Sequence, residues 1–121
     1  MRKISAQGVC LKIDGGDDVR TIDLGYEIGQ VVELEGKIIV RFQLRGEKTP
    51  DRNIVCLASN GDQIWQVQDP DEYRTGKKFE PRDLFGGIWI NERKELWAGG
   101  RSSDFLIDLR SGRILKEEFT K

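Results

Sequence analysis

The sequence predicts an all-β fold, an antiparallel meander of about ten strands in five hairpins, and two observations support this prediction. Short runs rich in Val, Ile, Leu and Trp are separated by turn residues such as Gly, Asp, Asn and Ser. Within these runs apolar and polar residues follow the two-residue period of a strand, and no stretch carries a persuasive helical stripe. At 121 residues the chain is expected to be one domain, residues 1–121, folded as a two-sheet sandwich or a partial propeller-like structure.

Five hairpins account for most of the chain. They are expected over residues 9–24, 31–44, 53–67, 87–98 and 105–116. The turn at Asn60-Gly61 carries the strongest signal, because a type I′ turn needs positive φ at both central positions. Helical structure is expected only as a short turn from Asp71 to Arg74, within the longest connection, Gln68 to Phe85. That connection also holds aromatic residues, so a binding or packing role and plain flexibility are both open for it.

Two hairpin segments share a turn pattern. Ile54 to Gly61 aligns with Phe105 to Gly112, and in both an apolar strand enters a turn with Gly and returns through apolar residues. Here the sequence resembles the hairpin repeat of β-propellers of the quinoprotein (PQQ-like) and WD40-like type, although Lys116 stands where those repeats usually have Trp. Propellers need about four or more blades of about 40–45 residues each, so the resemblance implies a sandwich or an open partial propeller. Generic hairpins are the alternative interpretation.

The chain contains no histidine, which removes the usual general base and the usual metal ligand near neutral pH. Its cysteines, Cys10 and Cys56, lie inside apolar runs and are expected to be buried thiols, with a disulfide as the alternative. Neither a zinc site nor a phosphate-binding loop is recognisable. The acidic residues Asp69, Asp71 and Glu72 lack the spacing of an EF-hand calcium loop. We therefore expect a protein that is not an enzyme, with no catalytic residue, no metal and no cofactor.

The net charge of −1 argues against a nucleic-acid-binding protein, although the stretch 37–52 is basic. Met1 to Ser5 does not resemble the start of a signal peptide, and the longest apolar run, Ile38 to Val40, is too short to span a membrane. We therefore expect a cytoplasmic protein with no nucleic-acid or membrane partner. A protein partner is expected instead.

The candidate binding residues are carboxylates and aromatic anchors that lie mainly in turns and in the longest connection. They are Asp17, Asp18, Asp69, Asp71, Glu72, Tyr73, Phe79, Asp83 and Trp89. Trp89 lies between Ile88 and Ile90 and therefore points to the opposite side of its strand. Either both faces of that strand are covered, or Trp89 is exposed as an anchor for another protein.

In size, mild acidity and lack of catalytic residues, the chain resembles the small all-β immunity proteins that protect bacteria from toxins. This resemblance implies a cytoplasmic inhibitor that masks the active or substrate-binding surface of a toxin, in many cases a basic nuclease. An acidic surface would steer such a partner toward the inhibitor. The alternative is a structural or scaffolding β-repeat module that forms a homo-oligomer through its strand edges.

Overall fold

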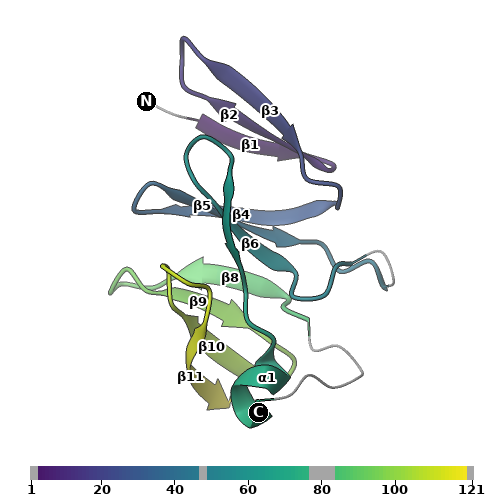
Figure 1. Cartoon of the computed structure of the whole chain (residues 1–121), viewed down its shortest axis with the longest axis vertical. Coiled ribbons are helices and arrows are strands. Elements are labelled where there is room, and N and C mark those ends of the chain that lie inside the picture. The colour runs from purple at the N-terminus through teal and green to yellow at the C-terminus, as the bar shows by residue number, and fades with distance from the viewer. Residues whose placement is uncertain (1–2, 47–48, 77–83, 120–121) are drawn as a thin grey trace.

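The structure, a computed structural model, describes residues 3–46, 49–76 and 84–119, and over these residues the chain forms eleven strands in three antiparallel sheets. The sheets follow one another along the long axis of the molecule (Figure 1). Each is a meander in which every strand pairs with the next one along the chain. The predicted all-β meander is confirmed, and the stack holds three sheets where a sandwich would have two.

The three sheets are named A, B and C in chain order. Sheet A contains β1 (Lys3–Gln7), β2 (Cys10–Asp14) and β3 (Val19–Asp23), in that spatial order. Sheet B contains β4 (Ile28–Leu34), β5 (Lys37–Phe42), β6 (Ile54–Leu57) and β7 (Gln63–Gln66), also in chain order. Sheet C contains β8 (Gly87–Ile90), β9 (Leu96–Gly99), β10 (Ser103–Ile107) and β11 (Ile114–Phe119), with β8 and β11 at its edges. The short helix α1 (Pro70–Thr75) lies between β7 and β8, where the sequence predicts a helical turn.

All five predicted hairpins are present, and β1 is the strand that the sequence pattern misses. Ile4 is its one large apolar residue, so the alternation is too weak to detect from the sequence. Pairing with β2 stabilises it, from Lys3 opposite Asp14 to Gln7 opposite Cys10. β1 is therefore a strand that depends on its neighbour more than on its own pattern.

Sheet B is covered on both faces, and this gives the molecule two apolar cores. Successive side chains of β5 point to opposite faces, so Ile38 and Val40 pack toward sheet A while Ile39 packs toward sheet C. The core between sheets A and B contains Leu11, Ile13, Ile38, Val40, Phe42, Val55 and Leu57. The core between sheets B and C contains Ile39, Ile54, Cys56, Trp65, Val67, Phe85, Ile88, Leu96, Ala98, Phe105, Ile107 and Ile114. The double burial explains why β5 and β6 have continuous apolar runs instead of alternating ones.

Three side chains with polar groups connect sheet B and the residue before β6 to sheet C, to the segment before β8 and to the β10–β11 turn. The side-chain amide of Gln30 donates to the carbonyl of Ile88 and accepts from its N–H, as a neighbouring strand would. The amide of Asn53, which is fully buried, joins the backbone of Phe42 to that of Phe85. The indole N–H of Trp65 donates to the carbonyl of Leu109 at 2.7 Å. These bonds satisfy buried polar groups and so fix how sheets B and C sit on each other.

Arg41 places a charged group between the same two sheets. The residue is 7% exposed, and its guanidinium donates to the side chain of Gln30 and to the carbonyl of Phe42. Desolvation by burial lowers the pKa of Arg41. Gly29 leaves the space that the guanidinium occupies, because a Cβ there would stand 2.9 Å from Nη2 of Arg41. A larger residue at position 29 would therefore have to displace the guanidinium of Arg41 and the side-chain amide of Gln43.

Both cysteines are free thiols, as the sequence predicts. Cys56 is fully buried in the core between sheets B and C, whereas Cys10 belongs to sheet A and is partly exposed. Burial raises the pKa of the Cys56 thiol to about 11. Cys56 therefore stays protonated near neutral pH and acts as a small apolar side chain.

Gly112 provides a test of how tightly the turns pack on the cores. Its φ is +76°, and a Cβ there would stand 2.7 Å from Cδ2 of Trp65. We predict that Gly112→Ala lowers the free energy of unfolding by about 2–4 kcal/mol, because left-handed strain and overpacking of Trp65 add together. Urea denaturation of the purified variant measures this loss.

Gly36→Ala is the matched control. Gly36 has nearly the same φ, +78°, but no atom lies within 4 Å of the position of its Cβ. The backbone strain alone should cost about 1–2 kcal/mol. Equal losses of unfolding free energy in the two variants would show that Trp65 moves aside at no cost, which would contradict the predicted overpacking.

Candidate functional site

The acidic residues expected to bind a partner fall into two separate groups. Asp17 and Asp18 lie in the turn between β2 and β3, at the end of the molecule formed by sheet A (Figure 1). Asp69, Asp71 and Glu72 lie at or in α1, at the opposite end (Figure 1). The structure therefore does not join these carboxylates into one acidic surface. Two further candidates, Phe79 and Asp83, lie outside the described residues.

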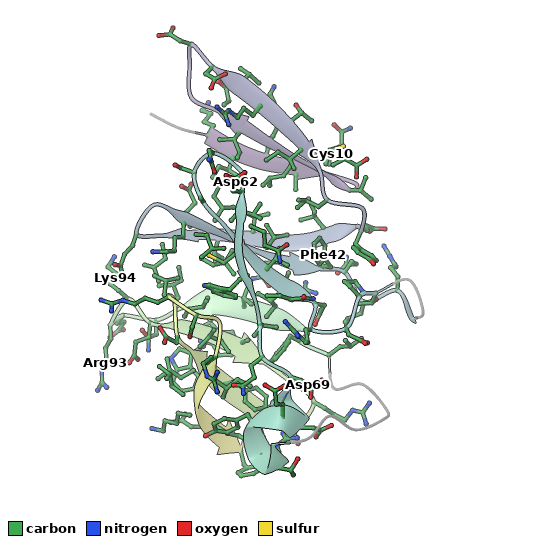
Figure 2. The ribbon with its side chains drawn as sticks, viewed as in Figure 1. Cys10, Phe42, Asp62, Asp69, Arg93 and Lys94 are labelled. Carbon is green, nitrogen blue, oxygen red and sulfur yellow. The ribbon has the colours of Figure 1, made fainter. Side chains whose placement is uncertain are left out.

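The carboxylates at α1 are used within the chain. Asp69 is buried, and its side chain caps the helix by accepting from the backbone N–H of Asp71 at 2.8 Å (its position beside α1 is marked in Figure 2). Asp71 pairs with Arg74 at 3.4 Å, and Glu72 accepts from the side chain of Gln68. Capping and pairing of this kind stabilise the helix itself. We therefore assign these three acidic residues a structural role.

Arg74 attaches α1 to sheet C. Its Nη2 lies 2.7 Å from Oε2 of Glu117 on β11, and its guanidinium carbon lies 5.5 Å from the ring centroid of Phe105 on β10. Ser103 also donates to Glu117, whose side chain is only 8% exposed. The hydrogen bond from Arg74 is the main cause that lowers the pKa of Glu117. Tyr73 packs against the core between sheets B and C from the same helix.

The β2–β3 turn is more open. Asp17 and Asp18 are exposed, and Asp18 pairs with Arg20 at 3.3 Å while both side chains remain largely in solvent. An exposed pair of this kind contributes at most about 1 kcal/mol. The turn therefore offers accessible carboxylates but no apolar anchor beside them, apart from Val19, which is 51% exposed.

Trp89 belongs to an apolar row on the outer face of sheet C. Ile88, next to Trp89, and Ala98, next to Trp97, point into the core, so Trp89 and the directly opposed Trp97 point away from sheet B. Trp97 is in turn opposite Leu106 on β10, and Leu106 is opposite Lys116 on β11. Trp89 is 39% exposed, while Trp97 and Leu106 are partly exposed. We call the outer face of β8 to β11 the Trp89 face.

A second row on the Trp89 face joins two glycines to two carboxylates. Gly87 is opposite Gly99, Gly99 is opposite Asp104, and Asp104 is opposite Glu118. A Cβ on Gly99 would stand 3.4 Å from Cζ3 of Trp89 and 3.5 Å from Oδ1 of Asp104. The indole ring and the carboxylate therefore converge above Gly99, where no side chain separates them.

The opposite end of the stack has a different surface. The outward positions of sheet A, on the face away from sheet B, are mostly polar. They are Lys3, Ser5, Gln7, Cys10, Lys12, Asp14, Val19, Thr21 and Asp23. Stacked repeats need a polar outer surface at each end to stay soluble as monomers. Sheet A provides such a cap, whereas sheet C ends in the row of Trp89, Trp97 and Leu106.

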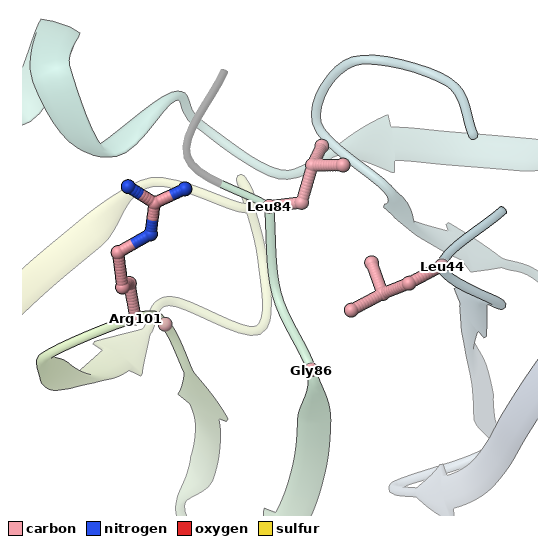
Figure 3. Close-up of a pocket in the computed structure, with 5 residues that line it drawn as sticks. Leu44, Leu84, Gly86 and Arg101 are labelled. Carbon is pink, nitrogen blue, oxygen red and sulfur yellow. The ribbon is translucent and has the colours of Figure 1, made fainter. Parts of the chain in front are cut away.

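Trp89, Trp97 and Leu106 line none of the described pockets, of which one of about 430 Å³ is lined by Val9, Gly25, Tyr26, Glu27 and Arg45. A pocket of about 340 Å³ is lined by Leu44, Leu84, Gly86, Gly100 and Arg101 (Figure 3). Its described lining offers one cation and no carboxylate. Within residues 3–46, 49–76 and 84–119, no three His, Cys, Asp or Glu side chains gather closely enough to hold a metal ion. In the same part of the chain, no helix is both long and apolar enough to cross a membrane.

Comparison with known proteins gives a family without an assigned activity. Residues 1–119 match the model of the domain of unknown function DUF7957. The chain belongs to this family. No curated protein and no solved structure matches it significantly. The match spans all three sheets.

The sequence identifies Trp89 as a candidate but does not reveal its surroundings. Alternation along β10 does place Asp104 and Leu106 on the side opposite Phe105, and this signal is readable. Their position beside Trp97 depends on the register between β9 and β10, which no single strand encodes. The sequence alone therefore does not identify Asp104 as a candidate binding residue.

The structural role of α1 can be tested through Glu117. Because the pKa of Glu117 is lowered in the folded protein, its ion pair stabilises the fold above the ordinary value of 4.5, and this contribution is lost as the pH falls through the folded value. We predict that Glu117→Gln lowers the free energy of unfolding by about 1–3 kcal/mol at pH 7. The difference from wild type should shrink below pH 4.5, as measured by urea denaturation over a pH series.

Glu72→Gln is the control for this pH series. Glu72 is exposed, and its carboxylate accepts only from Gln68 among the bonds described, so its replacement should change the free energy of unfolding by less than about 0.5 kcal/mol. A Glu117→Gln deficit that stays constant from pH 3 to pH 7 would contradict the role of the ionised carboxylate.

Proposed function

We propose that this protein is a binding module that docks another protein on the Trp89 face and inhibits it by covering its active or substrate-binding surface. The observation that carries the proposal is the exposure of Trp89 within an apolar row on a terminal sheet face, while the other end of the stack is polar. Large aromatic side chains held on a rigid surface are the usual anchors of protein interfaces.

The arrangement of the face supports binding by its physical character. Trp89 and Trp97 supply apolar area at little cost in conformational entropy, because the strands already hold their backbones and each indole has only two rotatable bonds. Polar side chains border the row at one end, where Lys116 lies, and along one side, where Asp104 and Glu118 lie, as part of the rim of an interface would. A stable interface buries about 800 Å² per partner, so the flanking turns of sheet C must take part.

An inhibitor of the toxin-immunity type is the form of this proposal that suits the composition of the chain best. The protein has no histidine. The Trp89 face is an exposed sheet surface that another protein can contact, and it is not a cleft that would enclose a substrate. In this proposal the partner is a toxin domain with a basic surface, and the inhibitor acts in the cytoplasm. The carboxylates at α1 are no longer part of the proposed contact, because they are used within the chain.

A second candidate function is a scaffolding module that self-associates through strand edges. It is favoured by β11, the outer edge of sheet C, where Leu115 is 58% and Phe119 is 77% exposed. An edge strand with exposed apolar side chains can pair with another chain. Sedimentation velocity over a concentration series separates the two functions, since a stable dimer that Trp89→Ser leaves intact would favour the edge.

The inhibitor proposal is tested with the product of the neighbouring gene. We predict that co-expression gives a complex and protects the cell from that product, and that Trp89→Ser raises the Kd at least about tenfold, since anchors of this kind contribute 2 kcal/mol or more. Isothermal titration calorimetry measures the Kd of each variant. Failure to form a complex would remove the inhibitor proposal.

Val19→Ser serves as the matched control for Trp89→Ser. Val19 is also an exposed apolar residue on a terminal sheet, but it lies on sheet A at the other end of the stack. Its replacement should leave the Kd within about twofold of wild type. Equal effects of the two substitutions would show that the complex does not form on the Trp89 face.

A further inference from the structure

We infer that the Trp89 face receives a cationic side chain, an arginine guanidinium or a lysine ammonium, from a basic partner protein, between the indole of Trp89 and the carboxylate of Asp104. This inference rests on the proposed function and adds the chemistry of the partner. It concerns one place on the face, the space above Gly99 where the ring and the carboxylate converge.

Asp104 is a carboxylate without a partner in the part of the chain that the structure describes. It is partly buried, and its side chain makes no hydrogen bond or ion pair with residues 3–46, 49–76 or 84–119. The other acidic residue of its row, Glu118, is paired with Lys116 at 3.0 Å. Among the inward carboxylates of the same sheet, Glu117 is paired with Arg74. Asp104 therefore stands apart as the free acceptor beside the apolar row.

The position of Asp104 restricts what can cover the Trp89 row. An apolar surface laid over Trp89 and Trp97 would also remove water from the Asp104 carboxylate, and desolvating an unpaired charge is strongly unfavourable. A partner that brings a cation to this point compensates for the lost hydration, because the cation donates a charge-assisted hydrogen bond to the carboxylate. The apolar row and the free carboxylate together therefore select a partner with a basic residue among apolar ones.

The geometry above Gly99 suits such a cation. Trp presents the most favourable ring for a cation–π contact, and Asp104 Oδ1 lies on the same side of the glycine. A side chain at position 99 would stand between the two groups, whereas glycine leaves the sheet surface open there. One guanidinium can thus donate to the carboxylate and stay close to the benzo ring of the indole, whose Cζ3 and Cη2 are the atoms nearest to Gly99.

A second copy of the chain that docks through its own sheet C offers this site one cation on the strands of that sheet, Lys116, and further cations only in its turns, such as Arg101 between β9 and β10. Lys116 is the one basic side chain at the outward strand positions of sheet C, and Glu118 already pairs with it. Arg93 and Lys94 extend away from the molecule at the tip of the β8–β9 turn, beyond the end of the strands (Figure 2). The outward strand charges of this face are Asp104, Glu118 and Lys116, so two Trp89 faces placed together would bring two carboxylates for each lysine, which is unfavourable.

The inference is tested by nuclear magnetic resonance with defined peptides. The ¹⁵N-labelled full chain is titrated with an acetylated tri-arginine amide, and with tri-alanine and tri-glutamate peptides of the same form. We predict that only the tri-arginine peptide shifts the indole N–H of Trp89 and the amide of Asp104, and that added salt weakens the effect.

Two isosteric substitutions on the same face give matched controls. Asp104→Asn should weaken tri-arginine binding about tenfold or more, because it removes the unpaired charge without changing the shape. Glu118→Gln should change it by no more than about twofold, because Glu118 already has a partner in Lys116. Shifts of equal size with tri-alanine, shifts located at Asp17 and Asp18, no shift with any peptide, or binding unchanged by Asp104→Asn would each overturn the inference.

The complex with the neighbouring gene product separates this inference from the proposed function. If Trp89→Ser disrupts that complex and Asp104→Asn does not, the docking face stands and the cation site is wrong. If neither substitution affects the complex, the proposed function on this face fails as well. A dimer that dissociates on Trp89→Ser in sedimentation experiments would replace the basic partner with a second copy.

Discussion

The double burial of sheet B is the constraint on which the rest of the structure depends. Because both faces of β5 and β6 are covered, sheets A and C must each present an apolar inner face to it. Their outer faces do not pack on sheet B and can therefore differ in composition. The outer face of sheet A is mostly polar, and that of sheet C carries aromatic side chains. The asymmetry between the two ends of the molecule follows from this arrangement of three layers.

Local signals in the sequence were sufficient for most strands and turns. Asn60-Gly61 correctly indicates its hairpin, but the predicted type I′ turn is wrong, because only Gly61 of the two has a positive φ. Continuous apolar runs indicate β5 and β6. β1 escaped detection, since Ile4 alone is too weak a signal. The number of sheets could not be predicted either. Alternation shows which face of a strand is apolar, but it does not show which sheet covers that face.

The candidate site shows the same limit more clearly. Trp89 could be predicted, because its place between two isoleucines puts it on the opposite side of its strand. The carboxylates of Asp69 and Asp71 were predicted to bind a partner, yet they cap and pair within α1. Asp104 becomes significant only beside Trp89, and strand register alone brings them together. Contacts between distant segments of chain are therefore the part that composition and periodicity do not contain.

The buried thiol of Cys56 gives this architecture an internal reporter. It lies in the middle layer of the stack, and burial raises its pKa to about 11, so alkylating reagents in solution reach it only when sheets B and C separate. Cys10, on the outer side of sheet A, remains partly accessible in the intact molecule. Comparing the labelling rates of Cys56 and Cys10 therefore measures how often sheets B and C separate. No added probe is needed, because both cysteines are native.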